Sequence, residues 1–355
     1  MTIYYLANAY SPHVRHWVEK CADNGIIVHI FTIHTNGPAD LNVPIHYLGS
    51  NLFKRFKVLN YIVAGLKLRS LKKKYNLKYL HAHNSSGYGL AAYLSGSKYL
   101  LTTYGSEILQ SNKKSPLYRF ILKKVLWNAE RISSTSTGLR DFIISNNLST
   151  KERIHNFSLG VKSHFICTNN KIGNDKFIIF SNRRMMNLYN IDEIIIAFSR
   201  FLKKHPRSNS TLILLEGDSE ANSDYIKKIK TLIKNYKLQN NIKTIKGFVS
   251  ESILLENLKS ATCTISIPNS DQLSSSILES MACGTLPILR DLDAYNVFKG
   301  LDIVEFLDNS LEDTLSNVYL NSQNLIDKQK RMQLFIRNLN LQVNIDINYF
   351  YSSLA

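Results

Sequence analysis

The sequence has 355 residues, which at roughly 100–200 residues per domain favours two domains. Hydrophobic residues make up 44% and charged residues 20%, a globular composition that excludes a disordered chain. No apolar run approaches the ~20 residues of a spanning helix, the N-terminus lacks the pattern of a secretory signal, and the four cysteines lie far apart. We therefore exclude a membrane-spanning protein, a disulfide scaffold and a zinc module, and expect a cytoplasmic protein with reduced thiols.

The net charge of +17 is concentrated in the first half of the chain. Residues 1–170 contain 22 Lys and Arg against 7 Asp and Glu, whereas the remainder carries a net charge of only +2. This asymmetry predicts a polyanionic partner for the N-terminal half, either a nucleic acid, an anionic membrane surface or a phosphorylated substrate, and the alternative is a solubilising face. No carboxylate lies between Asp40 and Glu107, where the basic residues are Lys54, Arg55, Lys57, Lys67, Arg69, Lys72, Lys73, Lys74, Lys78 and Lys98.

Apolar runs and helical periodicities alternate along the chain in two series. Residues 3–7 predict a buried strand, residues 12–24 a helix that stops at Gly25, and residues 26–33 a second strand. Two series separated by a polar stretch at residues 168–175 predict two doubly wound α/β domains, over residues 1–168 and 169–334. The first series continues with a basic amphipathic helix at 53–75, strands at 79–82 and 99–103, and a helix at 88–94. The second has strands at 177–181, 211–216, 242–245, 263–267 and 287–289, and helices at 191–204, 224–236, 250–260 and 275–283.

The strongest local feature is the segment PNSDQLSSSILESMACGTLPILRD at residues 268–291. A Ser-rich loop here opens a helix, whose free N–H groups and positive dipole end favour phosphate. Asp271 and Glu279 are eight positions apart, so both carboxylates can face one ligand, and carboxylates suit sugar hydroxyls. Taken alone, the same residues also fit a capped helix with Glu279 on its surface.

This segment resembles the signature of family 4 glycosyltransferases, a pattern similar to E-G-F-G-x-x-x-L-E-A-M-A-x-G-x-P-V. Asp271 takes the position of the first Glu and Glu279 that of the second, while Gln272 and Ser274 replace two glycines. The resemblance implies the α/β GT-B fold, in which two Rossmann-like doubly wound domains face a central cleft. It also implies that Glu279 holds the nucleotide ribose and that Asp271 contacts the donor sugar. The donor diphosphate would be bound by the loop residues Leu273, Ser274, Ser275 and Ser276.

Other segments resemble the same family. Arg184 matches the Arg of an R-x-x-x-x-K-G pattern whose cations neutralise the donor phosphates, and the adjacent Arg183 can assist it. Tyr189 stands at the Lys position, where a phenol can donate one hydrogen bond but supplies no cation. The remaining donor-side residues are Glu216, before a turn similar to the family's G-x-G, and Gly247 and Phe248, which match the segment lining the nucleotide base.

In the N-terminal half, His83 is the second histidine of a strand-end H-x-H pattern and matches the family residue near the reacting sugar. We therefore assign His83 to catalysis together with Asp271 and Arg184; without the resemblance, such a histidine is more often structural. Residues 335–355 resemble the terminal helix that crosses back onto the first domain. The acceptor-side residues are Ser11 and His13, from an S-x-H-x-x-x-W pattern, and Tyr104 and Gly105, from a T-Y-G-S-E segment similar to T-x-H-G-S-D.

The resemblance thus implies a retaining glycosyltransferase that takes a UDP- or GDP-sugar, and we expect it to need no cofactor and bind no metal. The expected acceptor is a glycan or a polyprenyl-diphosphate-linked glycan, in bacterial surface polysaccharide synthesis. The basic helix at 53–75 would attach the enzyme to the anionic inner face of the plasma membrane, through some of the apolar stripe Phe56, Leu59, Ile62, Val63 and Leu66.

Three alternatives stay open. A GT-B nucleotide-sugar 2-epimerase would keep the fold but would need no large second substrate. A non-catalytic basic protein would bind nucleic acid or membrane, although no RRM, KH or helix-turn-helix signature is present and we expect no nucleic-acid partner. The replaced lysine and glycines also fit an inactive partner subunit.

Overall fold

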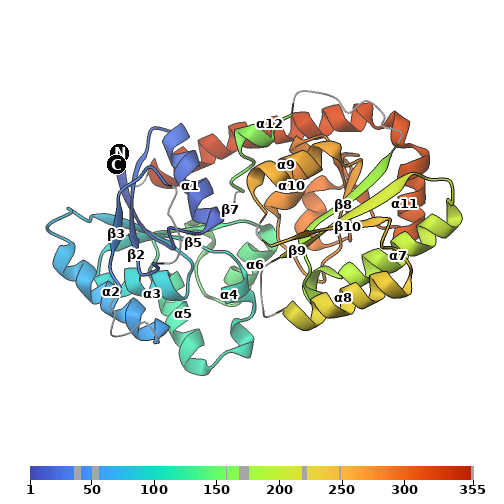
Figure 1. Cartoon of the computed structure of the whole chain (residues 1–355). Helices are drawn as coiled ribbons and strands as arrows, with labels where there is room; N and C mark the ends of the chain where they lie inside the picture. The colour runs from blue at the N-terminus through green and yellow to red at the C-terminus, as the bar shows by residue number, and fades with distance from the viewer. Residues whose placement is uncertain are drawn as a thin grey trace. The chain divides into compact units, whose positions relative to one another are not determined.

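The computed structural model describes residues 1–35, 41–49, 56–156, 158–167, 176–217, 222–247 and 249–352 (Figure 1). The chain divides into two compact units, the first made of Met1–Leu159 and Asn340–Ala355 and the second of Gly160–Leu339. The domain boundary expected at residue 168 falls within residues 168–175, which lie outside the described ranges.

A parallel sheet of seven strands, in the order β3-β2-β1-β4-β5-β6-β7, forms the centre of the first unit. Its central strands are almost wholly buried, as expected for a parallel sheet that helices cover on both faces. The strands predicted at 3–7, 26–33, 79–82 and 99–103 are confirmed as β1, β2, β4 and β5. The strands are β1 (Thr2–Leu6), β2 (Ile27–Thr32), β3 (Ile45–Tyr47), β4 (Tyr79–His83), β5 (Lys98–Thr102), β6 (Arg131–Ser134) and β7 (Ile154–Asn156).

Two layers of helices cover this sheet (Figure 1). In one layer α1 (Pro12–Asp23) packs against the end of α12 (Ile326–Ser352), where the rings of Trp17 and Phe350 are 6.0 Å apart. In the other layer α3 (Gly87–Ser95) packs against both α2 (Lys57–Leu71) and α5 (Pro116–Asn128). The remaining helices of the unit are α4 (Ser106–Leu109) and α6 (Thr137–Ser145).

The apolar stripe of the helix at 53–75, of which only some members were expected to reach lipid, is partly packed and partly exposed on α2. The buried positions of α2 are Asn60, Ala64, Gly65 and Leu68, and the first, second and fourth of these follow one another at a spacing of four residues along a single helix face. Ile62 and Val63 are half-buried. Three members of the stripe are instead exposed, namely Phe56, Leu59 and Leu66.

A parallel sheet of six strands, in the order β10-β9-β8-β11-β12-β13, forms the centre of the second unit. The predicted strands and helices of the second series are confirmed to within a few residues at their ends. The strands are β8 (Phe177–Arg184), β9 (Ser210–Gly217), β10 (Ile242–Lys246), β11 (Cys263–Ser266), β12 (Leu286–Leu289) and β13 (Glu305–Phe306).

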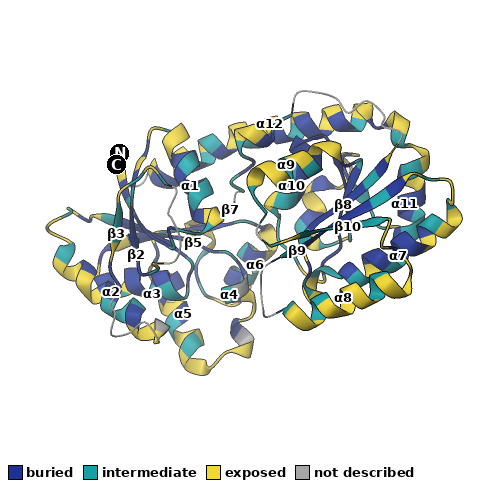
Figure 2. Cartoon of the chain, viewed as in Figure 1, coloured by how far each residue is buried: buried dark blue, intermediate teal, exposed yellow. Residues whose placement is uncertain are grey.

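Helices of the second unit bury one face against this sheet and expose the other (Figure 2). α7, for example, buries Ile191, Ile194, Ile195 and Phe198, while its last turn carries exposed lysines. None of the helices in the described ranges combines the length and the apolarity needed to span a bilayer. The helices are α7 (Ile191–Lys204), α8 (Ser223–Asn235), α9 (Glu251–Ser260), α10 (Ser275–Ala282), α11 (Leu311–Leu320) and the first part of α12.

Candidate active site

The strand order of the second unit reverses between β8 and β11, which are neighbours in the sheet. From β8 the chain proceeds to β9 on one side, and from β11 to β12 on the other. Doubly wound sheets bind ligands at this switch point, beyond the carboxyl ends of the strands. Arg183 lies at the carboxyl end of β8 and Ser266 ends β11, from which residues 267–274 lead into α10. The fold therefore brings the motif of residues 268–291 to the switch point.

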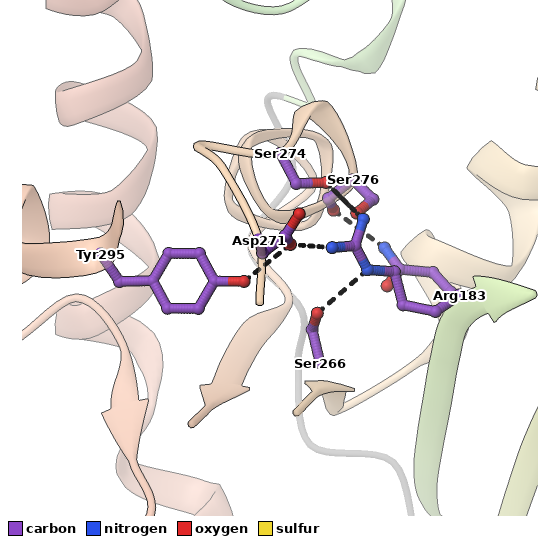
Figure 3. A network of polar contacts seen from close by, with 7 residues as sticks. Arg183, Ser266, Asp271, Ser274, Ser276 and Tyr295 are labelled. Carbon is purple, nitrogen blue, oxygen red and sulfur yellow. Dashed lines mark hydrogen bonds and ion pairs between the residues drawn. The ribbon is translucent and has the colours of Figure 1, made fainter. Parts of the chain in front are cut away.

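Arg183 is the centre of a polar cluster at this point (Figure 3). Its Nε donates to Oγ of Ser266 at 3.1 Å, and its Nη1 donates to Oγ of Ser274 at 2.6 Å and of Ser276 at 3.0 Å. Its Nη2 forms an ion pair with Asp271, and only 10% of the arginine side chain is exposed. Because a guanidinium is a planar fork of donors, this arrangement provides a fixed cation that matches phosphate or carboxylate oxygens.

Asp271 receives a second donor that the sequence did not indicate. The hydroxyl of Tyr295 donates to Oδ2 of Asp271 at 2.7 Å, and Oδ2 also accepts from Arg183 (Figure 3). Tyr295 lies on the 3₁₀ helix Asp293–Phe298 that follows β12, and it is fully buried. No spacing or motif in the sequence joins residues 271 and 295, so only the fold could reveal this contact.

Tyr189 supports the Arg183 guanidinium from one side. The guanidinium carbon is 4.6 Å from the centroid of the Tyr189 ring, a cation–π distance. Tyr189 ends the turn Asn187–Tyr189, and the next residue, Asn190, has a φ of 50°. This left-handed conformation favours Gly or Asn, which explains how Asn190 replaces the Gly of the R-x-x-x-x-K-G pattern. Tyr189 therefore orients a cation in place of supplying one.

Glu279 lies on α10, directly after the serine loop. Burial raises the pKa of Glu279 to about 7, and a hydrogen bond from Ser275 together with the charges of Lys162 and Arg183 opposes this shift. Near neutral pH the carboxyl group therefore exchanges between a protonated form, which can donate a hydrogen bond, and an ionised form, which can only accept hydrogen bonds. The ionised form is suited to accept hydrogen bonds from two neighbouring hydroxyls.

Arg184, assigned to catalysis from the sequence, lies elsewhere. The pairing of β8 with β9 shifts register between Ser181 and Arg184, and Arg184 is exposed. Its side chain runs beside Gly217 at the end of β9, 3.5 Å from where a Cβ would stand on that glycine. Arg183 therefore contacts the serine loop, whereas Arg184 lies along the neighbouring strand.

Other donor-side residues have their own partners or lie outside the described ranges. Oε1 of Glu216 accepts from Nζ of Lys230 at 2.8 Å. Leu273 packs against the hydrophobic core of the second unit, and Gly247 follows β10. Phe248 lies outside the described residues.

In the first unit, His83 ends β4 next to the switch point between β1 and β4. Its Nδ1 is 2.9 Å from the hydroxyl of Tyr104, and the ring of His13 is 5.1 Å from the Tyr104 ring. Burial lowers the pKa of His83 to about 3, so the imidazole is neutral. Its Nε2 is buried and has no hydrogen-bond partner among the described residues. Ser11 precedes α1 and Gly105 precedes α4.

Glu107 joins this group and was not assigned from the sequence. Its Oε1 accepts from the Tyr104 N–H at 3.0 Å and from the Ser85 hydroxyl at 3.3 Å. Its Oε2 is buried and lacks a hydrogen-bond partner within the described ranges. The available signal was the position of Glu107 in T-Y-G-S-E, where the related pattern T-x-H-G-S-D has Asp.

Two family models match this sequence. Residues 2–136 match the model described as glycosyl transferase 4-like, and residues 164–297 match the model of the glycosyl transferases group 1. The chain is a family 4-like glycosyltransferase. It is therefore an enzyme, and the cluster around Arg183 lies within the second matched range.

Solved structures share the fold of this glycosyltransferase at low sequence identity. Sucrose-phosphate synthase from Thermosynechococcus elongatus is 15% identical with a TM-score of 0.82, and the match covers 100% of this chain and 99% of that one. A glycosyltransferase from Rickettsia africae is 16% identical with a TM-score of 0.79, covering 99% and 98%. Anabaena HepE, solved in complex with UDP, is 12% identical with a TM-score of 0.79, covering 99% and 100%. No curated protein matches the sequence significantly. These similarities show that the glycosyltransferase has the GT-B fold.

Proposed function

We propose that this enzyme transfers a sugar from a UDP- or GDP-sugar to a glycan or lipid-linked glycan, with retention of the anomeric configuration. The observation that carries the proposal is the cluster at the switch point of the second unit. There Arg183, whose side chain is only 10% exposed, donates to the hydroxyls of Ser274 at the end of the loop and Ser276 in the first turn of α10, beside the carboxylate of Asp271. HepE structures with UDP and with UDP-glucose support a nucleotide sugar as the donor class.

The chemistry follows from the charge that develops on the leaving group. Breaking the bond between sugar and diphosphate places negative charge on the phosphate oxygens. Arg183 and the N-terminus of α10 supply fixed positive charge and donors to receive it. Asp271 would hold a donor sugar hydroxyl, and Glu279 would accept from the ribose.

We propose that the reaction needs no metal ion, because Arg183 and the N-terminus of α10 would neutralise the diphosphate charge that a metal ion would otherwise neutralise. Within the part of the chain that the structure describes, no three His, Cys, Asp or Glu side chains gather so as to hold a metal ion. Turnover in excess chelator tests this point directly.

We assign acceptor binding to the group at the carboxyl ends of β4 and β5 in the first unit. Nε2 of His83 and Oε2 of Glu107 are buried polar atoms with no partner within the described ranges, and such atoms are costly unless a ligand or water satisfies them. Tyr104 contacts both residues, through its hydroxyl and its N–H respectively. Acceptor hydroxyls offer the hydrogen bonds that this pair lacks.

We further propose attachment to the inner face of a bacterial plasma membrane, in surface polysaccharide synthesis. The two helices that flank α3, α2 and α5, expose apolar side chains together with lysines. Figure 2 colours much of both helices as exposed. Apolar side chains among basic ones suit an interface with anionic lipid. The exposed apolar residues of this face are Phe56, Val58, Leu59 and Leu66 around α2, and Leu117, Phe120 and Trp127 on α5.

The decisive experiment is a donor panel. The enzyme is incubated with UDP-glucose, GDP-mannose and other nucleotide sugars in excess EDTA, and nucleoside diphosphate release is measured with an Arg183→Ala variant as control. The proposal is supported if the wild-type enzyme slowly hydrolyses one donor and the Arg183→Ala variant does not. An epimerised donor would instead identify a 2-epimerase, and donor binding without release would identify an inactive subunit. For a transferred sugar, NMR of the product linkage determines whether the configuration is retained.

A further inference from the structure

We infer that Tyr295 is a positioning residue, which holds one oxygen of Asp271 so that only the other is presented to the donor sugar. This inference rests on the proposed function, because it takes Asp271 to be the residue that contacts a hydroxyl of that sugar. It adds a residue that no motif in the sequence includes, and it gives the two carboxylate oxygens different roles.

The two oxygens of Asp271 have unequal surroundings. Both donors reach Oδ2, namely Nη2 of Arg183 and the hydroxyl of Tyr295, the latter at 2.7 Å. In the described part of the chain no group donates to Oδ1, and Figure 3 shows this oxygen directed away from both donors. The side chain of Asp271 is 16% exposed. Oδ1 is therefore the oxygen left to accept a hydrogen bond from a ligand.

Tyr295 is well placed to act as a fixed donor. It is fully buried, and its ring packs 6.5 Å from that of Phe298 on the same 3₁₀ helix. Burial also raises the pKa of Tyr295 to about 12, so its hydroxyl keeps its proton across the physiological range. Because a phenol in this state has one proton to give, its bond to Asp271 is directional.

Two donors on one oxygen restrict rotation of the carboxylate. Arg183 alone would leave the carboxylate free to turn about Oδ2, because only Nη2 reaches Asp271 while Nε and Nη1 donate to serine hydroxyls. Tyr295 approaches Oδ2 from a different element, at the end of β12, and so selects one orientation. A carboxylate held in this way recognises a single sugar hydroxyl at Oδ1. Because the donor sugar is then held in the geometry that reacts, the orientation of Asp271 contributes to the rate of sugar transfer.

The test compares two tyrosines that make the same kind of bond. Tyr295→Phe removes the hydroxyl beside Asp271, and the control Tyr225→Phe removes a hydroxyl that donates to Oδ1 of Asp192 at 2.8 Å, between α8 and α7. The probes are UDP-glucose for turnover and UDP for binding, or the GDP pair if the donor panel selects it. We expect kcat/KM to fall roughly 10- to 100-fold in Tyr295→Phe, as for one hydrogen bond to a charged group, with UDP affinity unchanged. In Tyr225→Phe both values should equal those of the wild type.

A double-mutant cycle shows whether Tyr295 acts through Asp271. In an Asp271→Asn background, Tyr295→Phe should cause little further loss, because the oxygen it orients has lost its charge. Additive losses, or equal losses of UDP binding and of turnover, would overturn the inference and leave Tyr295 a structural residue. Wild-type kinetics in Tyr295→Phe would overturn it too. Failure of the proposed function looks different, because the wild-type enzyme would then act on no nucleotide sugar at all.

Discussion

The hydroxyl of Tyr351, on the last turn of α12, lies 2.7 Å from Nδ1 of His81 in β4. The same hydroxyl is 2.9 Å from that of Tyr5 in β1, and Nε2 of His81 is 2.7 Å from Oγ1 of Thr102 in β5. All four residues are buried. A continuous polar chain through the core of the first unit thus joins three central strands to the end of the chain.

Tyr351→Phe should therefore destabilise the first unit. It leaves the buried Nδ1 of His81 without its partner, whereas the hydroxyl of Tyr5 keeps Sγ of Cys21 at 3.0 Å, so we expect a loss of about 1–3 kcal/mol. Urea unfolding followed by circular dichroism measures this loss. The control is Tyr349→Phe on the same helix, whose ring is exposed. A stability equal to that of the control would show that the polar chain contributes nothing.

Stability of the first unit should fall as the pH is lowered. Burial holds the pKa of His81 well below its usual value of 6.5, and that of His83 at about 3. The unfolded state therefore binds more protons below pH 6.5, so stability is present above that pH and lost below it. Each histidine should contribute a slope of about 1.4 kcal/mol per pH unit. Urea titrations at pH 7.5, 6.5 and 5.5 measure the slope, which His83→Asn should reduce.

Arg183→Ala should reduce turnover far more than Arg184→Ala does. Arg183 donates to the serine loop, and removing one such donor from a developing oxyanion lowers kcat about 10²–10³-fold. Arg184 is exposed, so its loss should change kcat by no more than about threefold. The rate of donor hydrolysis by the two variants distinguishes the two assignments. A larger loss in Arg184→Ala would show that the family pattern identified the catalytic arginine correctly and that the assignment of Arg183 is wrong.

Donor binding should depend on pH through Glu279. Because the pKa of this carboxyl is raised to about 7, UDP affinity should increase as the pH rises through that value and the acceptor form appears. Glu279→Gln should bind UDP roughly 10- to 100-fold more weakly at pH 8 and show no such pH dependence. Calorimetry at pH 6 and pH 8 measures both effects. An unchanged affinity in the variant would remove Glu279 from the site.

Glu279→Gln should also change the pH dependence of stability. The folded pKa lies above the unfolded value of 4.5, so the native carboxyl binds more protons and the contribution of Glu279 to stability declines between about pH 4.5 and 7. The variant lacks this decline and should be the more stable protein at pH 8. Thermal unfolding at pH 5 and pH 8 provides the comparison, and a constant difference between the two proteins would contradict the raised pKa.

The enzyme should co-sediment with anionic vesicles and not with neutral ones. Basic residues near an anionic surface contribute about 1 kcal/mol each, and the attraction should weaken as the Debye length falls from ~10 Å at 0.1 M salt to ~3 Å at 1 M. Reversal of Lys72, Lys73 and Lys74 to Glu should release the protein, and so should Trp127→Ser. Reversing three exposed lysines of the second unit (Lys203, Lys234 and Lys243) is the matched control. Equal binding to neutral vesicles would exclude the electrostatic attachment.

Much of the architecture could be predicted from the sequence alone, because each strand and helix has its own local pattern of apolar residues. A buried parallel strand is a short apolar run and a covering helix is amphipathic, so the alternation of the two predicted two doubly wound units. The motif at residues 268–291 is local too, since a strand end, a serine loop and a helix start follow one another directly. Asp271 and Glu279 could therefore be selected by spacing.

Only the tertiary structure decided which side chains meet. The family pattern in the sequence selects Arg184, but the structure places Arg183 against the serine loop, next to a register shift between β8 and β9. Such irregularities re-aim side chains, and the hydrophobic pattern of a single strand does not reveal them. Tyr295 reaches Asp271 because β12, which precedes it, pairs with β11, which precedes Asp271.

The face of α2 was decided in the same way. The sequence predicts that some of the large apolar side chains pack and others reach lipid, but it does not say which. Small residues on a helix permit a close approach of a neighbouring helix, which large side chains would obstruct. A Cβ on Gly65 would stand 2.8 Å from the carbonyl oxygen of Ala91 in α3, so the two helices meet backbone to backbone. Ala64 and Leu68 are consequently buried, and Phe56 and Leu66 are left outside. Helical periodicity shows that a helix has an apolar face, but the shape of its neighbour determines which face is buried.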